Sequence, residues 1–234
     1  MTRAAVELNQ VIEAVQCSVP LRHIVLPDEF FPAHLSVALI DAVFSSKGQH
    51  NSGTLSATER YCRWFRIVRT RANQWDQPAP EAQETLTDMI GHFDELGMGR
   101  MTEEVFCTMQ LLPDAKVARV EFVLHAAREL RRGGIEVLQD VQALPYEQIE
   151  RTLGGCAGFG EAASRMFQMY TGNDNFVRGD ECVCRFVADA LGREKISAAR
   201  AVRLVRRCAY ELAISPRYLD NQIWRRHSTW SMVA

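Results

Sequence analysis

The helical spacing of apolar residues is the feature that most limits which folds this chain can adopt. In the segment 115–134, apolar side chains recur every three or four residues, and two glycines end the run. Segment 197–213 repeats the pattern, with Ser197 in position to cap a helix. The apolar residues of the first segment are Val117, Val120, Val123, Leu124, Ala127 and Leu130.

Helices are predicted along almost the whole chain, and the sequence therefore indicates an all-α protein. Only "PLRHIVLP" (20–27) and "GIEVLQDV" (134–141) could form short strands, and neither has a partner strand in view. The one loop with the composition of a domain boundary is the short segment 73–82. The predicted helices are 3–16, 33–46, 54–71, 80–96, 101–111, 115–132, 146–153, 160–171, 180–191, 196–213 and 216–226.

Composition and charge are those of an ordinary globular protein. The 234 residues suffice for one large domain or two lobes, and the net charge of -2 gives no overall attraction to nucleic acid or membrane. From Arg185 to Arg226, however, ten Lys and Arg face four Asp and Glu. This segment is either a basic binding surface or a solvated helix face.

The seven cysteines do not predict a disulfide scaffold or a metal site. They are scattered, odd in number and contain no CxxC pair, so free thiols in a reducing compartment are the better interpretation. The first residues are amphipathic rather than a signal peptide, and no apolar run reaches membrane-spanning length. We expect a cytoplasmic, monomeric protein with no cofactor, no metal and no membrane partner.

The glycine-rich stretch "GCAGFGEAAS" (155–164) is typical of phosphate binding. It lacks the Lys-Ser/Thr pair of a nucleotide P-loop. It matches GxGxxA, with Asp180 downstream, but no strand precedes it as a dinucleotide fold requires. The third option is a tight turn at Gly158, Phe159 and Gly160 between two helices, where backbone N–H groups bind one DNA phosphate. That contact positions a protein on DNA without reading sequence.

The chain after this turn resembles the helix-hairpin-helix DNA glycosylases, the superfamily that includes endonuclease III. The family motif reads Leu-Pro-Gly-Val-Gly-x-Lys-Thr-Ala, then a helix, then Val-Asp-Thr-His-Val-x-Arg. Gly158-Phe159-Gly160 matches Gly-Val-Gly without a gap down to Asp180, and Val183 and Arg185 match the Val-x-Arg. The resemblance extends over most of the chain from Phe31 onward, although only the segment from the turn to the aspartate is specific.

Two departures from the family pattern change what the resemblance implies. Bifunctional members have a lysine that attacks the sugar, and this chain has Ala162 at that position. The four-cysteine loop of cluster-containing members is also absent. The resemblance therefore implies a monofunctional glycosylase without an iron–sulfur cluster. Cys156-Ala157 in place of Leu-Pro, and Glu181-Cys182 in place of Thr-His, leave the substrate open.

Asp180 is the candidate catalytic residue. Cleavage of an N-glycosidic bond develops positive charge on the deoxyribose, and a carboxylate can stabilise that charge and orient the attacking water. Aspartate is also a favoured helix N-cap, so a purely structural role is the alternative, and both roles are compatible.

A flipped base leaves a gap in the duplex that a protein side chain commonly fills. The polar loop 45–53 has the matching place in the family, and its candidates for DNA contact are Lys47, Gln49, His50 and Asn51. The alternative is a solvated loop. Candidates for a base pocket are Asp41, Phe44, Tyr61 and Trp64. Asp41 could equally form a structural salt bridge, and the aromatic residues could belong to the core.

The resemblance implies a single glycosylase-like unit, residues 1–234, with two lobes. The helical barrel lobe is expected at 30–155, and the second lobe combines 1–29 with 156–234, including the hairpin. We expect the partner to be double-stranded DNA that contains a damaged or modified base, and the protein to associate with the nucleoid. The rival hypotheses are a non-catalytic helix-hairpin-helix DNA-binding protein and a helical protein-interaction module.

Overall fold

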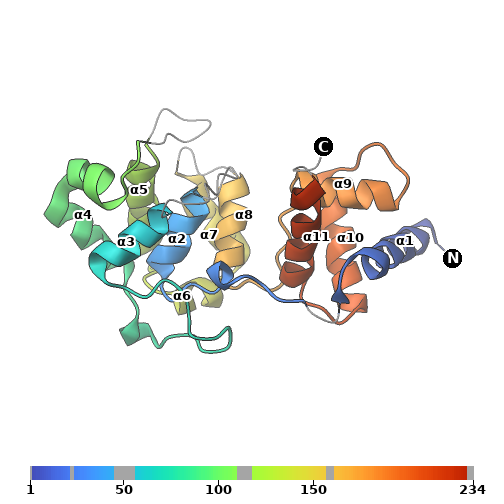
Figure 1. Cartoon of the computed structure of the whole chain (residues 1–234), viewed down its shortest axis with the longest axis horizontal. Coiled ribbons are helices and arrows are strands. Elements are labelled where there is room, and N and C mark those ends of the chain that lie inside the picture. The colour runs from blue at the N-terminus through green and yellow to red at the C-terminus, as the bar shows by residue number, and fades with distance from the viewer. Residues whose placement is uncertain (1, 22–23, 45–55, 110–117, 157–160, 231–234) are drawn as a thin grey trace. The chain divides into compact units, whose positions relative to one another are not determined.

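The computed structural model describes residues 2–21, 24–44, 56–109, 118–156 and 161–230, and these residues form an all-α protein (Figure 1). These ranges contain no β-strand, and an isolated bridge joins Pro32 to Thr70. The all-α prediction is therefore confirmed. None of the helices in the described ranges combines the length and apolar character needed to cross a bilayer.

The chain divides into two compact units, and one of them is made from two separate stretches of sequence. Unit 1 contains residues 1–26 and 173–234, and unit 2 contains residues 27–172. The boundaries predicted from sequence, after residues 29 and 155, differ from these. The second boundary lies later because the helix 161–170, which follows the glycine-rich segment, packs within unit 2 against the helix 35–44.

Unit 2 is built around α2 (Leu35–Phe44), whose residues 35–43 are all buried. The sequence of α2 is apolar on nearly every side, which is what a central helix requires. It packs against α3, α5 and α8, and α5 also packs against α4 and α7. The other elements of unit 2 are η2 (Asp28–Phe30), α3 (Ala57–Phe65), η3 (Pro80–Ala82), α4 (Leu86–Arg100), η4 (Met101–Val105), α5 (Arg119–Arg132), α6 (Leu138–Ala143), α7 (Tyr146–Gly154) and α8 (Glu161–Tyr170).

Unit 1 consists of α1 (Arg3–Ser18), α9 (Glu181–Ala190), α10 (Ala198–Glu211) and α11 (Pro216–Trp230). Helix α10 packs against each of the other three. The apolar stripe of α1 joins the same core as the C-terminal helices. Fully buried members of this core are Val11, Val15, Val183, Val187, Val205, Cys208, Leu219 and Ile223.

Several helix ends depart from the sequence prediction for local reasons. Helix α3 ends at Phe65 because Arg66 adopts a left-handed conformation with φ of 57°. Helix α4 begins only at Leu86, where Thr85 and Asp88 form a reciprocal capping box. Gly97, with φ of 76° and ψ of 156°, then kinks this helix before the π-turn of η4.

The two possible strands are not formed. Segment 134–141 was a strand candidate, but residues 138–143 form α6, because Asp140 accepts hydrogen bonds from the backbone N–H groups of Glu136 and Val137 and so begins a helix. The described residues of 20–27 contain no strand either.

Candidate functional site

Asp180 is the N-cap of α9, in an extended conformation with φ of -72° and ψ of -177°. Its Oδ1 accepts a hydrogen bond from the backbone N–H of Val183 at 3.0 Å. The residue before it, Gly179, has φ of 59°, a conformation that favours glycine. The Asp180 side chain is 34% exposed, so the carboxylate both caps the helix and reaches solvent.

Arg178 lies beside this carboxylate and binds a second one more closely. Its Nε is 3.6 Å from Oδ2 of Asp180 and 2.7 Å from Oδ2 of Asp220. The backbone N–H of Arg178 also donates to Oδ1 of Asp220 at 2.9 Å. Asp220 on α11 is completely buried, and this burial raises its pKa, against the opposing effect of the Arg178 guanidinium.

Trp224 completes this arrangement one helical turn after Asp220. The guanidinium carbon of Arg178 is 5.3 Å from the centre of the Trp224 ring, within the range of a cation–π contact. We call Arg178, Asp180, Asp220 and Trp224 the Asp180 cluster. Its chemistry is a partly exposed carboxylate beside a cation that a buried carboxylate and an aromatic ring hold in place.

The loop that leads to Asp180 is fixed by the turn between α10 and α11. The carbonyl oxygen of Asp174 accepts hydrogen bonds from the Arg217 backbone at 3.1 Å and from the Ser215 hydroxyl at 3.0 Å. The Tyr210 hydroxyl donates to Oδ1 of Asn175 at 3.0 Å. These contacts limit the positions that the Asp180 carboxylate can take.

Most of the predicted DNA-binding residues lie outside the described residues, namely Gly158, Phe159, Gly160, Lys47, Gln49, His50 and Asn51. Arg185 is described, and it is exposed on α9. Its Nη2 donates to Oε1 of Glu181 at 3.0 Å, in an ion pair between neighbouring turns of the helix.

Asp41, a predicted pocket residue, is buried on α2 and forms the salt bridge that was its alternative interpretation. The Thr58 hydroxyl donates to Oδ1 of Asp41 at 2.5 Å, and Nη2 of Arg69 donates to the same atom at 3.3 Å. Burial raises the pKa of Asp41, while Arg69 acts in the opposite direction. The second oxygen, Oδ2, has no hydrogen-bond partner among the described residues.

The three predicted pocket aromatics occupy different environments. Tyr61 is completely buried, with its ring stacked against Phe106 at 5.5 Å between centres, and Phe44 stacks on the same Phe106 at 5.9 Å. Trp64 is 43% exposed. Tyr61 therefore packs in the core of unit 2, and Phe44 is half-buried against Phe106.

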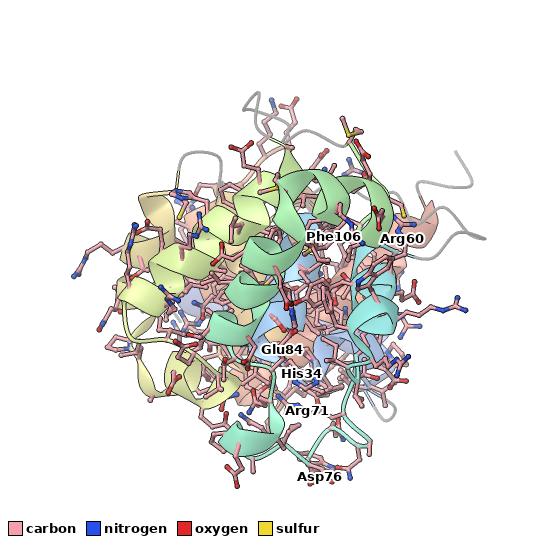
Figure 2. All side chains as sticks on the ribbon, turned by 90° about the vertical axis from the view of Figure 1, so that its left-hand side faces the viewer. His34, Arg60, Arg71, Asp76, Glu84 and Phe106 are labelled. Carbon is pink, nitrogen blue, oxygen red and sulfur yellow. The ribbon has the colours of Figure 1, made fainter. Side chains whose placement is uncertain are left out.

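A buried carboxylate that was not predicted, Glu84, contacts three helices of unit 2. Figure 2 shows Glu84 close to His34. The Tyr61 hydroxyl donates to Oε1 of Glu84 at 2.9 Å, His92 Nε2 lies 3.1 Å from the same atom, and the Ser36 hydroxyl donates to Oε2. The backbone N–H of Glu84 donates to Nδ1 of His34 at 2.8 Å. This network connects α2, α3 and α4 and has a structural role in the unit.

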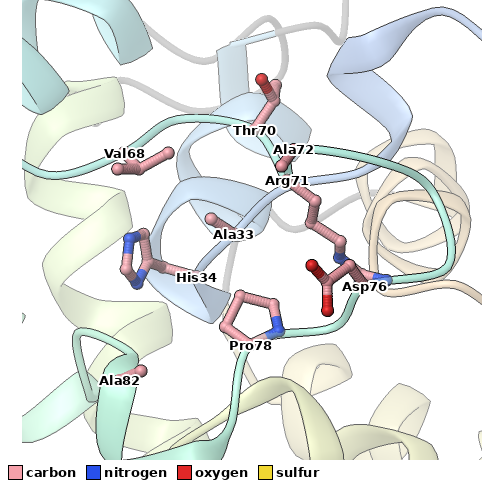
Figure 3. Close-up of a pocket in the computed structure, with 9 residues that line it drawn as sticks. All are labelled: Ala33, His34, Val68, Thr70, Arg71, Ala72, Asp76, Pro78 and Ala82. Carbon is pink, nitrogen blue, oxygen red and sulfur yellow. The ribbon is translucent and has the colours of Figure 1, made fainter.

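A pocket of about 320 Å³ lies next to this network, on unit 2. Figure 3 shows Arg71 pointing toward Asp76 across the pocket, with the His34 ring on another side. Burial lowers the pKa of His34, so the neutral ring faces the pocket near neutral pH. None of the four predicted pocket residues lines it; the lining residues are Ala33, His34, Val68, Thr70, Arg71, Ala72, Asp76, Pro78 and Ala82.

Thiols and metal-binding groups are dispersed. All seven cysteines are free, and those at 62, 156 and 208 are buried. Burial raises the pKa of Cys62 and of Cys208 to about 12, so neither is a reactive thiolate near neutral pH. In the part of the chain that the structure describes, no group of three His, Cys, Asp or Glu side chains could hold a metal ion.

Among the predicted site residues that the structure describes, Asp180 lies beside the buried ion pair of Arg178 and Asp220 and also reaches solvent. Asp220 and Trp224 were missed. A usable signal was the segment "YLDNQIW", where an aspartate stands between Leu219 and Ile223 on the apolar side of a helix.

Comparison with curated proteins and with solved structures gives no match. One family model matches residues 8–228, which is nearly the whole chain, and its description is "Domain of unknown function (DUF8548)". The chain belongs to this family.

Proposed function

We propose that this protein is a monofunctional DNA glycosylase, which flips a damaged or modified base out of duplex DNA and hydrolyses its N-glycosidic bond with Asp180. The observation that carries the proposal is the order of elements around the glycine turn. Helix α7 ends at Gly154, α8 begins at Glu161, and Asp180 caps α9 after a fixed loop. This is the order in which the resembled family arranges its hairpin and its aspartate.

The Asp180 carboxylate is suited to the chemistry in two respects. Its exposed part can approach a deoxyribose, where the carboxylate stabilises the charge that develops as the base leaves. It can also accept the proton of a water molecule that attacks the anomeric carbon, while the bonding electrons leave with the base. The Arg178 side chain, held by Asp220, fixes the orientation of the carboxylate without contact with the sugar.

Two further features agree with this proposal. The residue at position 162 is alanine, so water rather than a lysine amine is the nucleophile, and no strand cleavage through a Schiff base is expected. The all-helical units 1 and 2 are compatible with the two-lobed glycosylase fold, which we propose with duplex DNA as the partner, a monomeric state and a location at the nucleoid.

One observation favours a second candidate, a non-catalytic DNA-binding protein. Oδ1 of Asp180 is used by the helix cap and Oδ2 lies near Arg178, so both oxygens already have structural neighbours. In this alternative the aspartate remains because it begins α9.

The test is base release from a panel of duplexes that contain uracil, alkylated purines, oxidised bases or hypermodified bases. Asp180→Asn is the informative variant because asparagine caps a helix about as well as aspartate, and the fold is therefore retained. We expect base release to fall about 10²- to 10⁴-fold. Asp189→Asn, at the exposed far end of the same helix, is the matched control and should release base at the wild-type rate.

Three results would contradict the proposal. Asp180→Asn could release base as fast as the wild type, which removes the catalytic role. Borohydride could trap a covalent DNA adduct, which indicates a Schiff base and contradicts the monofunctional mechanism. Finally, the wild type could bind duplex with a steep salt dependence yet release no base from any substrate, which favours the non-catalytic candidate.

A further inference from the structure

Helix α10 presents three exposed arginines on the side opposite its core. Arg203, Arg206 and Arg207 lie within about one turn of the helix and are all exposed, and we call them the arginine stripe. Tyr210, 54% exposed, continues the same side of the helix. The opposite side is buried and consists of Ala201, Leu204, Val205, Cys208 and Ala209.

The arginines of the stripe have no acidic partner among the described residues, unlike other arginines of unit 1. Arg193 and Arg200 both bind the Glu7 carboxylate, Arg193 at 2.6 Å. Glu211 stands one turn after Arg207, but the described residues contain no ion pair between them. Because an arginine side chain is charged at any physiological pH, the stripe carries three uncompensated positive charges.

The charge of the two units differs in sign, and the stripe lies on the positive one. Unit 1 has thirteen Lys and Arg against nine Asp and Glu, whereas unit 2 has fourteen against twenty. The overall net charge of -2 therefore conceals a basic unit. A basic face on one unit is the electrostatic footprint of a protein that binds a polyanion.

We propose that the arginine stripe binds the phosphate backbone of duplex DNA, without reading its sequence. The three arginines follow each other within about 6 Å along the helix axis, and a duplex offers about one phosphate charge per 1.7 Å of its own axis. Guanidinium groups are well suited to bind phosphate oxygens. The choice of DNA among polyanions rests on the proposed function, but the surface is separate from the Asp180 cluster.

An anionic membrane surface is a poorer fit for this helix. A helix that lies on a membrane inserts an exposed apolar side into the lipid. The apolar side of α10 instead packs against α1, α9 and α11 and is not available. An acidic protein partner would require a complementary surface, whereas a backbone of regularly spaced phosphates needs only exposed guanidinium groups.

The experiment measures binding of an undamaged fluorescent duplex of about 30 base pairs at several salt concentrations. The wild type is compared with the triple variant Arg203→Gln, Arg206→Gln, Arg207→Gln. The loss of three phosphate contacts should lower the slope of log affinity against log salt by about 2.7. The wild type should therefore bind more tightly than the variant at about 50 mM salt, and the ratio of the two affinities should fall about 40-fold when the salt is raised to about 200 mM.

Two control variants separate the stripe from a general effect of charge. Arg63→Gln, Arg131→Gln, Arg132→Gln removes the same charge from exposed positions of unit 2, and its slope should stay close to that of the wild type. Replacement of the stripe by three lysines keeps the charge and should keep most of the slope. All the changed side chains are exposed, so thermal unfolding should confirm that each variant is folded.

The proposal is overturned if the stripe variant keeps the wild-type slope, if the unit 2 variant loses as much, or if the wild type binds anionic vesicles or an acidic protein but not duplex. Failure here differs from failure of the proposed function. If Asp180→Asn abolishes base release at saturating protein while the stripe variant binds DNA normally, only the stripe is wrong. If no base is released yet the slope changes as expected, only the glycosylase is wrong.

Discussion

Removal of the Asp220 carboxylate should destabilise the protein more than any other single change in the Asp180 cluster. Asp220 has no exposed surface, and it accepts hydrogen bonds from both the backbone N–H and the side chain of Arg178, whose own side chain is 8% exposed. Asp220→Ala removes the carboxylate nearest to this buried guanidinium, while the Asp180 carboxylate stays 3.6 Å away. Loss of one member of a buried ion pair costs about 3–5 kcal/mol, against a total stability of about 5–15 kcal/mol.

The measurement is urea unfolding at neutral pH, followed by circular dichroism, together with the melting temperature. If the chain unfolds as one unit, the expected loss lowers Tm by about 6–20 °C for a protein of this size. Asp220→Asn keeps the acceptor for the Arg178 backbone but removes the charge, and should cost about 1.5–3 kcal/mol. Asp189→Ala is an exposed control that should stay within about 0.5 kcal/mol of the wild type.

A double-mutant cycle identifies the cause of the loss. In the variant that combines Asp220→Ala with Arg178→Met, neither member of the buried ion pair is left alone, and Asp180, which also loses its contact with Arg178, is 34% exposed. The combined loss should therefore be smaller than the sum of the two single losses. A combined loss equal to that sum would refute the reasoning, because it would mean that the two side chains act independently. An unchanged stability of Asp220→Ala would refute it as well.

Three other regions of the structure give further predictions. Hydrogen bonds from arginines, above all Arg200, lower the pKa of Glu7 below 4.5. The stabilisation that Glu7 contributes should therefore be complete above pH 4.5 and lost below it. The difference in stability between wild type and Glu7→Gln, measured across about pH 3–7, checks this and should not grow as the pH falls. Gly97→Ala should lower the free energy of unfolding in urea by about 1–3 kcal/mol, because the φ and ψ of Gly97 suit only glycine. Gly91→Ala, in the same helix and with open space around it, should instead raise it by about 0.5–1 kcal/mol. Equal effects of the two substitutions would contradict the kink at Gly97. Tyr61→Phe should cost about 1–3 kcal/mol by the same measurement, because the buried Glu84 loses a donor; no loss would show that the hydroxyl is not needed there.

Local periodicity predicted the helices well, and its failures have local causes. The end of α3 depends on the left-handed conformation of Arg66, which is not a residue that usually marks a helix end. Segment 134–141 contains the β-branched residues Ile135 and Val137, which favour a strand, but the capping contacts of Asp140 begin a helix there. Such contacts involve a few atoms and leave almost no trace in the spacing of apolar residues.

The candidate site was predictable only in part. Sequence reasoning identified Asp180 and correctly gave helix capping as one of its roles. It missed Asp220 and Trp224, because both belong to a helix about forty residues further along the chain and only folding brings them to Arg178. Tyr61 was a pocket candidate with the core as the alternative, and its ring lies in the core. Its hydroxyl donates to Glu84, whose role was not foreseen.

The two-part origin of unit 1 has a consequence for synthesis on the ribosome. Helix α1 is made before its partners α9, α10 and α11, which begin only at Glu181. At about 5–20 residues per second, the apolar side of α1 waits roughly 10–40 seconds for them. Unit 2 is continuous and can fold during that interval. During synthesis the apolar side of α1 is therefore exposed to solvent until α9, α10 and α11 have been made.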